Sequence, residues 1–257
     1  MIKKTLFIYG AGASKADYAP VQNELFSEIF DLLEGVNDYQ NGTITPDLFK
    51  DIKEFLYKLY PINKEMDNQV LYPTFEEVMG LIYFAIIRNE SFKGISYNYL
   101  TYYREALTAL IAIVLDKKLR NIPNVNRQFL KCLFTTFQSD YNNETEESDS
   151  PNKFMKYFSF LNINYDILLD NAIFALQLPH RIEYDYGFEI KNRFTKLKLF
   201  KPHGSLNWLV CKSCGKIKTE DEKKSALKYY YKILDKSTDR LNCDCGAYYS
   251  PLIIPPS

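Results

Sequence analysis

The hydrophobic positions at the start of the chain predict a strand, a glycine turn and a helix. Residues 4–9 form a short apolar run that ends at a glycine, which is typical of a buried strand. After Pro20, apolar residues recur at helical spacing as far as Gly35, so a helix is expected to end there. Residues 36–44 are polar and rich in turn-forming residues, which predicts a loop.

A block of helices is expected next. The pattern predicts a helix from Asp47 to Tyr60, ended by Pro61. Thr74 and Glu77 have the spacing of a capping box, in which each side chain bonds the backbone amide of the other residue. The helix that starts there is expected to continue to about Arg88.

Two longer helices are expected near 97–119 and 124–137. The first contains the apolar run Ala106–Leu115, which is far shorter than the ~20 residues of a membrane span, and we interpret it as a buried helix. Residues 138–152 contain almost nothing to bury and several acidic side chains, so we expect a solvated acidic loop.

After residue 155 the pattern returns to short apolar runs. The predicted elements are a strand at Tyr157–Ile163, a helix at Ile167–Leu176, a strand at Leu197–Phe200, a helix at Lys223–Leu234 and a strand at Leu252–Ile254. Strands that alternate with helices are typical of an α/β fold. The chain is therefore predicted to be an α/β protein interrupted by a helical insertion.

Composition narrows the functional classes. The chain of 257 residues is 46% hydrophobic, which is enough for one large or two small packed domains. Its 32 basic and 32 acidic residues leave a formal net charge of zero, so no global field attracts DNA or RNA. The first apolar stretch is too short for a signal sequence. We therefore expect a cytoplasmic protein with no membrane and no direct nucleic-acid partner.

Gly10 and Gly12 follow the first predicted strand and precede a helix. Glycines there let the backbone approach a pyrophosphate, which the amide groups and the helix dipole attract. The third glycine of a dinucleotide fingerprint is absent, because Lys15 occupies its position. An ordinary tight turn between strand and helix explains the two glycines equally well.

Asn162, Asn164 and Asp166 follow the predicted strand at Tyr157–Ile163. Ligands of open α/β sheets bind beyond the carboxyl ends of the strands, where these side chains are expected to lie. Alternatively, Asp166 caps the next helix. Capping does not account for the two asparagines.

His203 follows the strand predicted at Leu197–Phe200, again at a carboxyl end. Gly204 beside it lets a ligand or another backbone segment come close. An isolated histidine is usually a packed or surface residue. Here a second strand end carries comparable chemistry, which favours a functional role.

Four of the five cysteines form two close pairs, each followed by a glycine. In a chain without a secretory signal, such pairs indicate a metal site before a disulfide, and four thiolates suit tetrahedral zinc. The candidate ligands are Cys211, Cys214, Cys243 and Cys245. A redox-active CxxC pair is the alternative.

The fifth cysteine, Cys132, lies in the predicted helix 124–137. We place it on an apolar helix face with Phe129, Leu133 and Phe137. Buried free cysteines behave as small hydrophobic residues, and we expect Cys132 to be one.

The order of these motifs resembles the SIR2-like (sirtuin-related) family. The sequence GAGAS near the N-terminus, NYD after a strand, HGS, and paired cysteines around an insert are similar to its prokaryotic antiphage-defence branch. Thr74-Phe75-Glu76-Glu77 also resembles a helix start in that branch. The resemblance runs from about Phe7 to Pro256, and in the middle helices it is one of general character only.

The resemblance implies a fold. Members have a Rossmann-like parallel sheet of the SIR2-like, DHS type, and many carry a zinc-ribbon module. The implied division is a Rossmann-like NAD-binding domain at 1–44, 155–210 and 250–257, a helical insertion at 45–137, an acidic loop at 138–154 and a zinc-binding module at 211–249.

The resemblance also implies roles for the candidate residues. Asn164 matches the asparagine of the nicotinamide-ribose pocket, Asp166 the acid that holds the carboxamide, and His203 the catalytic histidine. The four paired cysteines match structural zinc ligands. The residues implied to bind NAD are Gly10, Ala11, Gly12, Ala13, Ser14, Asn162, Gly204 and Ser205.

Two departures from the family refine the expected function. Lys15–Pro20 lacks the Phe-Arg pair of deacetylating sirtuins, which favours hydrolysis of NAD to nicotinamide and ADP-ribose as an antiphage effector. Family members also continue beyond the position of Ser257, so the resemblance implies a domain truncated at its C-terminus. The alternatives are an NAD-dependent deacylase or ADP-ribosyltransferase, and a non-catalytic nucleotide-binding module. A homo-oligomer or defence-system partner proteins are expected.

Overall fold

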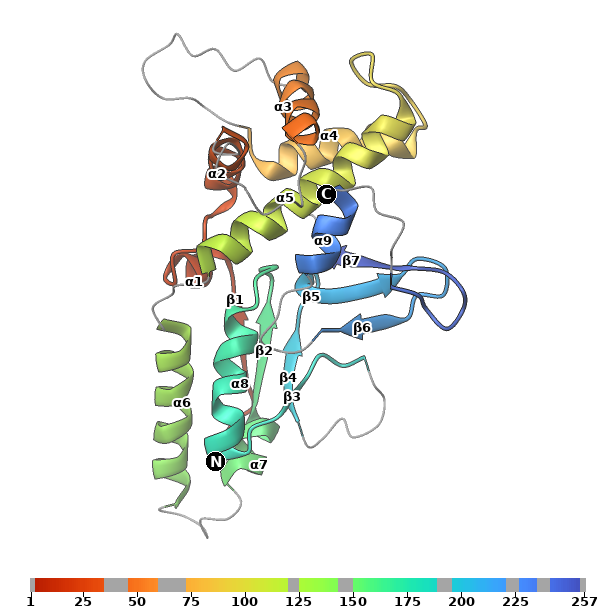
Figure 1. Cartoon of the computed structure of the whole chain (residues 1–257). Coiled ribbons are helices and arrows are strands. Elements are labelled where there is room, and N and C mark those ends of the chain that lie inside the picture. The colour runs from red at the N-terminus through yellow and green to blue at the C-terminus, as the bar shows by residue number, and fades with distance from the viewer. Residues whose placement is uncertain are drawn as a thin grey trace, which may run out of the picture.

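A computed structural model describes residues 3–34, 46–59, 73–119, 125–142, 150–188, 196–220, 227–234 and 241–254. These residues form a parallel and an antiparallel sheet, with a group of helices beside them (Figure 1). The parallel sheet confirms the predicted α/β class. Its strand order is β1 (Thr5–Tyr9), β2 (Phe158–Asn162), β4 (Leu197–Phe200) and β3 (Tyr184–Asp185).

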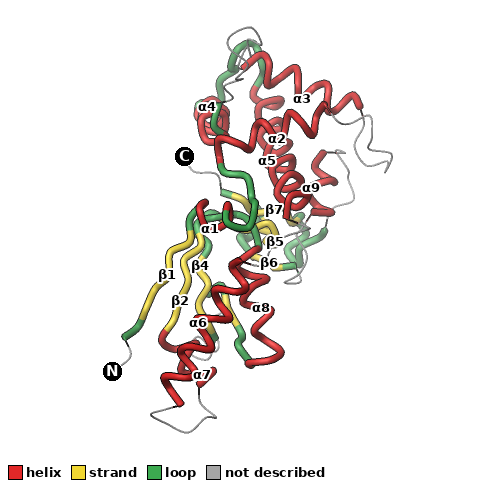
Figure 2. The backbone as a smooth tube through the Cα atoms, turned by 90° about the vertical axis from the view of Figure 1, so that its left-hand side faces the viewer, coloured by secondary structure: helices red, strands yellow, loops and turns green. Residues whose placement is uncertain are grey.

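Helices cover one face of the parallel sheet. Figure 2 shows α6 (Val125–Asn142), α7 (Ser150–Tyr157) and α8 (Leu168–His180) on the same side of the strands. Inward-facing residues of β2 and β4 pack with these helices in one core. The buried members of that core are Leu130, Phe134, Phe137, Phe154, Met155, Phe158, Phe160, Leu169, Ala172, Ile173, Leu176, Ile182, Leu197 and Leu199.

Strand β1 is formed as predicted, but the expectation that it is buried is wrong, because three of its five residues are exposed and the other two are only partly buried. Phe7 faces the helices and stacks on Phe160, with ring centroids 5.3 Å apart. Leu6 and Ile8 point to the other face and are 52% and 68% exposed. Within the described residues β1 pairs with β2 alone, so it is an edge strand with one covered face.

The helices predicted from Pro20 to Gly35, at 47–60, from Thr74 to Arg88 and at 97–119 are formed as α2 (Gln22–Glu34), α3 (Pro46–Leu59), α4 (Phe75–Ile87) and α5 (Tyr97–Leu119). These four helices pack in one core, and we call them the helical block. A short helix α1 (Ala11–Lys15) precedes them. The apolar run of α5 is buried at the centre of this block, as predicted.

The capping box at the start of α4 is also confirmed. The Thr74 hydroxyl accepts from the Glu77 amide at 3.2 Å, and the Glu77 carboxylate accepts from the Thr74 amide at 2.8 Å. Both side chains satisfy amides that the first turn of a helix leaves free. The helix start is therefore fixed locally.

The expected acidic loop is helical at both ends. Helix α6 continues to Asn142 and α7 begins at Ser150, while 143–149 lie outside the described residues. The prediction that Cys132 is buried is wrong, because its side chain is exposed. Leu130, Phe134 and Phe137 form the buried stripe of α6, and Cys132 lies on the opposite side of the helix.

The antiparallel sheet has the order β6 (Ile217–Thr219), β5 (Gly204–Cys211) and β7 (Tyr249–Ile253), with α9 (Leu227–Leu234) packed beside it. β5 was not predicted, although it is the longest described strand, because nearly all its residues are buried and no alternation shows. Its core is shared with the helical block, for example through Leu209 and Tyr230.

Packing groups the elements differently from the implied division of the chain. Helix α2, within the expected NAD-binding segment 1–44, packs in the core of the helical block. Helix α6, in the expected insertion 45–137, packs mainly on α7 and α8, in the core that covers the parallel sheet. No helix among the described residues combines the length and the apolar character that crossing a membrane requires.

Candidate functional site

The parallel register places two of the predicted motifs side by side. Tyr9 pairs with Asn162, so the turn after β1 and the loop after β2 leave the sheet at the same edge. The amide of Ile163 donates to the Tyr9 carbonyl at 3.0 Å and extends this pairing. Residues far apart in the sequence therefore meet where ligands of α/β sheets bind.

Ser14, Asn164 and Asp166 form a hydrogen-bonded group, which we call the strand-end cluster. The amide nitrogen Nδ2 of Asn164 donates to the Ser14 hydroxyl at 2.7 Å and to the Gly10 carbonyl at 2.8 Å. Ser14 in turn donates to Oδ2 of Asp166 at 2.5 Å. The structure thus brings together three of the predicted site residues from both motifs.

Asp166 has a structural role as well as its place in the cluster. Its Oδ1 accepts from the amide of Leu168 at 3.0 Å, at the start of α8, although Ile167 is the N-cap residue itself. Burial raises the pKa of this carboxyl above its usual range, while the Lys201 ammonium and the Ser14 hydroxyl lower it. The capping alternative therefore holds for one oxygen only.

Asn162 supports the loop rather than the cluster directly. Its side chain is buried, and its Oδ1 accepts from the backbone amide of Asn164 at 3.0 Å. This bond closes a turn of the kind that asparagine commonly makes with the amide two residues on. It fixes the direction in which the Asn164 side chain leaves the backbone.

The glycine turn leaves open space at one position. Gly12 is exposed, and a Cβ built there meets nothing within 4 Å. Gly10 is extended, with φ −110°, a conformation open to any residue. The fold of the turn therefore does not require glycine at either position. If glycine is required at position 12, the reason is a ligand that comes close to the backbone there.

Asp17 ties the turn to helix α6 and was not predicted. Its carboxylate accepts from the amides of Val125 at 2.8 Å and Asn126 at 3.1 Å, which are free donors at the start of α6. Asn126 also donates to the Ala13 carbonyl at 3.1 Å. The contact spans more than a hundred residues, so no local pattern reveals it.

Lys201 is a second residue that the sequence did not reveal. Its side chain is fully buried, and its ammonium donates to the Asp166 carbonyl at 2.6 Å, to Ser205 at 2.6 Å and to Asp170 at 3.0 Å. All three protons of the ammonium are used. Lys201 therefore joins the loop after β2, the start of α8 and the start of β5.

His203 follows β4 as predicted and is partly exposed. Its Nδ1 lies 3.2 Å from the carbonyl oxygen of Ile254, and its ring packs edge-on to Tyr165 at 6.3 Å. A carbonyl can only accept, so this contact favours the neutral tautomer with the proton on Nδ1. In that tautomer Nε2 carries the free lone pair.

Gly204 and Ser205 have partners within the protein. Gly204 has φ +79°, and a Cβ there would lie 2.2 Å from the Leu252 carbonyl oxygen of β7, so only glycine fits. The sequence predicted that either a ligand or another backbone segment comes close to Gly204. In the structure it is the backbone of β7. Ser205 is buried under Lys201.

The four paired cysteines lie together, as the sequence predicts. Their Sγ atoms all lie within 4.8 Å of one another, with 3.4 Å between Cys211 and Cys245 and 3.7 Å between Cys214 and Cys243. Tetrahedral zinc with Zn–S bonds of about 2.3 Å places its sulfurs about 3.8 Å apart. The cluster can therefore hold a metal ion such as zinc.

Each cysteine pair is shaped by a glycine. Gly215 and Gly246 have φ +73° and +86°, and their amides donate to the carbonyls of Cys211 and Cys243 at 2.8 and 2.9 Å. The backbone amide of Cys245 lowers the pKa of the Cys243 thiol to about 6, which favours the thiolate that binds metal.

The fold and these groups define an α/β protein with a candidate metal centre and a polar cluster at the strand ends of its parallel sheet. No protein-family model matches the chain. None of the curated proteins is significantly similar to it.

Proposed function

We propose that this chain is a SIR2-like NAD hydrolase domain that cleaves the bond between nicotinamide and ribose. The observation that supports it is the strand-end cluster, in which the glycine turn and the loop after β2 contribute hydrogen-bonded side chains to one sheet edge. Such an edge is where α/β proteins bind nucleotides. The exposed turn at Gly12 offers space for a phosphate nearby.

Asn164 positions the oxygen that attacks the ribose. Both protons of its Nδ2 are used within the protein, which orients the amide. Among the described residues Oδ1 has no donor, so it can accept from a water molecule or a ribose hydroxyl. The Nδ2 group is thus held by the protein and Oδ1 is available to the substrate, which suits a residue that orients the substrate without reacting.

Asp166 anchors the leaving group. Each of its oxygens accepts one bond within the protein and keeps a second lone pair for an amide N–H donor such as the nicotinamide carboxamide. Positive charge builds on the ribose as the bond breaks, as in other glycosyl transfers. A buried carboxylate stabilises such charge well, because little water screens it.

His203 acts as general base. The tautomer favoured by the Ile254 carbonyl leaves Nε2 free to take a proton from the attacking water or hydroxyl. The four-cysteine cluster binds structural zinc in this proposal and takes no part in the reaction.

The proposal is tested by NAD turnover in a preparation of the full-length protein, with and without cell or phage lysate. We expect His203→Ala and Asn164→Ala to abolish NAD loss while the melting temperature stays within a few degrees of the parent. Unchanged NAD consumption in both variants overturns the assignment. Products are identified by chromatography, with nicotinamide and free ADP-ribose expected in equal amounts.

The same products separate the alternatives. O-acetyl-ADP-ribose formed from an acetyl-lysine peptide indicates a deacylase, and label from NAD retained on protein indicates an ADP-ribosyltransferase. NAD binding without turnover in any preparation favours a non-catalytic module of a defence complex. Size measurement of the same sample distinguishes a homo-oligomer from an assembly with partner proteins.

A further inference from the structure

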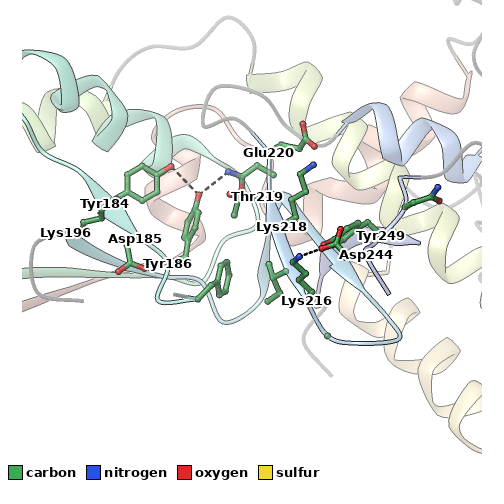
Figure 3. Close-up of a pocket in the computed structure, with 15 residues that line it drawn as sticks. Tyr184, Asp185, Tyr186, Lys196, Lys216, Lys218, Thr219, Glu220, Asp244 and Tyr249 are labelled. Carbon is green, nitrogen blue, oxygen red and sulfur yellow. Dashed lines mark hydrogen bonds and ion pairs between the residues drawn. The ribbon is translucent and has the colours of Figure 1, made fainter. Parts of the chain in front are cut away.

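A cavity of about 1030 Å³ lies between the two sheets, apart from the strand-end cluster. One wall is formed by Tyr184, Asp185 and Tyr186, and the other by β6 and the cysteine turns (Figure 3). None of the residues that line it belongs to the proposed catalytic set. Its volume is that of a site for a nucleotide-sized ligand.

Asn207 of β5 lines this cavity and carries an acceptor without a donor. The residue is fully buried, and among the described residues its Oδ1 has no hydrogen-bond partner. Its Nδ2 donates to the Tyr186 hydroxyl at 3.1 Å, and that hydroxyl donates to Asp170. Rotating the amide by 180° would break this series of hydrogen bonds, so its orientation is fixed. Oδ1 can therefore accept a hydrogen bond from a ligand.

Phe188 gives the cavity an aromatic surface. It is 41% exposed, although its ring packs edge-on to Trp208 with centroids 4.5 Å apart and lies 5.8 Å from Tyr186. The remaining ring surface lines the cavity. An exposed aromatic ring fixed by two others is a platform for a planar ligand.

Among the described residues, one lysine that lines the cavity makes no ion pair. Four ion pairs involve the lining residues, namely Lys216–Asp244, Lys198–Asp185, Lys196–Glu183 and Lys228–Glu220. Lys218 of β6 is the lining lysine without an ion pair in the described part of the chain, and Figure 3 shows it on the wall opposite Tyr186. A free ammonium beside a cavity favours an anionic group.

From these features we propose that the cavity binds a nucleoside monophosphate whose base carries an amino group. The base stacks on Phe188, its amino group donates to Oδ1 of Asn207, and the phosphate pairs with Lys218. The three contacts lie on separate elements, so one ligand joins the β3 side of the cavity to the zinc-module side. The site does not depend on the proposed hydrolysis of NAD.

The test is calorimetric titration of the zinc-loaded protein with AMP and with purine riboside monophosphate, which lacks only the amino group. We expect AMP to bind at least tenfold more tightly, because the analogue leaves Oδ1 of Asn207 unpaired. Adenosine, without the phosphate, is expected to bind about tenfold more weakly than AMP. Equal affinity for AMP and the analogue, or no binding of AMP at millimolar concentration, overturns the proposal.

Variants locate the bound nucleotide. Lys218→Glu exchanges an exposed charge and is expected to weaken AMP at least tenfold, whereas the control Lys131→Glu on the exposed side of α6 leaves affinity unchanged. Phe188→Leu is expected to weaken AMP through loss of stacking. If Asn164→Ala abolishes AMP binding and Lys218→Glu does not, the nucleotide occupies the strand-end cluster and the cavity proposal is wrong.

Discussion

The four-cysteine cluster and the strand-end cluster are assembled in different ways. Each cysteine pair is brought together within a few residues by a glycine turn, and one antiparallel sheet brings the pairs into contact. The strand-end cluster joins Ser14 to residues of the loop after β2, about 150 positions later, through the register of a parallel sheet. The first site is mainly local, and the second depends on the whole fold.

Because of this difference, we expect substitutions to affect the two clusters in different ways. Losing one cysteine removes a ligand from a site that has few other supports. The strand-end cluster is held by a second layer of buried groups, including Lys201 and Asp17. Substitutions of these buried groups are therefore expected to lower the free energy of unfolding less than loss of a bound metal would. They are expected to act through the parallel sheet.

The largest effect is expected from Cys243→Ser. A structural zinc contributes on the order of 10 kcal/mol of binding free energy, so losing a ligand should abolish stoichiometric zinc and unfold the module. The measurements are metal content by atomic emission and the melting temperature with and without chelator. Cys132→Ser is the matched control, because that cysteine is exposed and outside the cluster. Normal zinc content in Cys243→Ser would contradict the metal site.

The next largest effect is expected from Lys201→Met. It leaves the fully buried carboxylate of Asp170 without its cation, which typically costs about 3–5 kcal/mol. Denaturant unfolding measures the loss. The double variant Lys201→Met, Asp170→Asn removes both charges and is expected to recover a large part of it. A single variant as stable as the parent would show that the ion pair does not hold the segment after β4 to helix α8.

Gly204→Ala and Gly12→Ala form a pair that separates folding from binding. An added Cβ at Gly204 meets the Leu252 carbonyl at a positive φ, so a loss of about 1–3 kcal/mol or more is expected. At Gly12 the same methyl group meets open space, and stability should be kept. Under the proposed function, Gly12→Ala lowers NAD turnover instead. Equal melting temperatures for both variants would contradict this contrast.

The smallest effect is expected from Thr74→Ala, which lies far from both clusters in sequence. It removes the cap of α4 and should lower stability by about 1 kcal/mol, while zinc content and nucleotide binding stay unchanged. Thermal unfolding measures the shift. A change in metal content would show that the helical block and the metal site are more tightly coupled than their separate elements suggest.

Much of the fold follows from periodicity. Helix α5 has the predicted bounds, α3, α4 and β2 differ from prediction by few residues, and the capping box at Thr74 and Glu77 is formed. The cysteine cluster was also predictable, because its ligand spacing is written in the sequence. The helices and the capping box depend on residues within one or two turns of each other, and each cysteine pair on residues two or three positions apart.

What could not be predicted depends on burial and on distant contacts. β5 carries no alternating pattern because nearly all of it is buried, and the buried phase of α6 places Cys132 on the solvent side. Lys201 is a charged residue that the sequence presents as a surface position, and only its three acceptors explain its burial. No spacing rule anticipates such a residue.

The pairing of β1 with β2 also sets an order for folding during synthesis. Thr5 pairs with Phe158, so the first strand must wait until more than half of the chain has been made. Helices α2, α3, α4 and α5 also pack on one another, and these contacts can form first. During that interval the apolar side chains of Leu6, Phe7 and Ile8 have no sheet to join, so this strand is open to pairing with other chains.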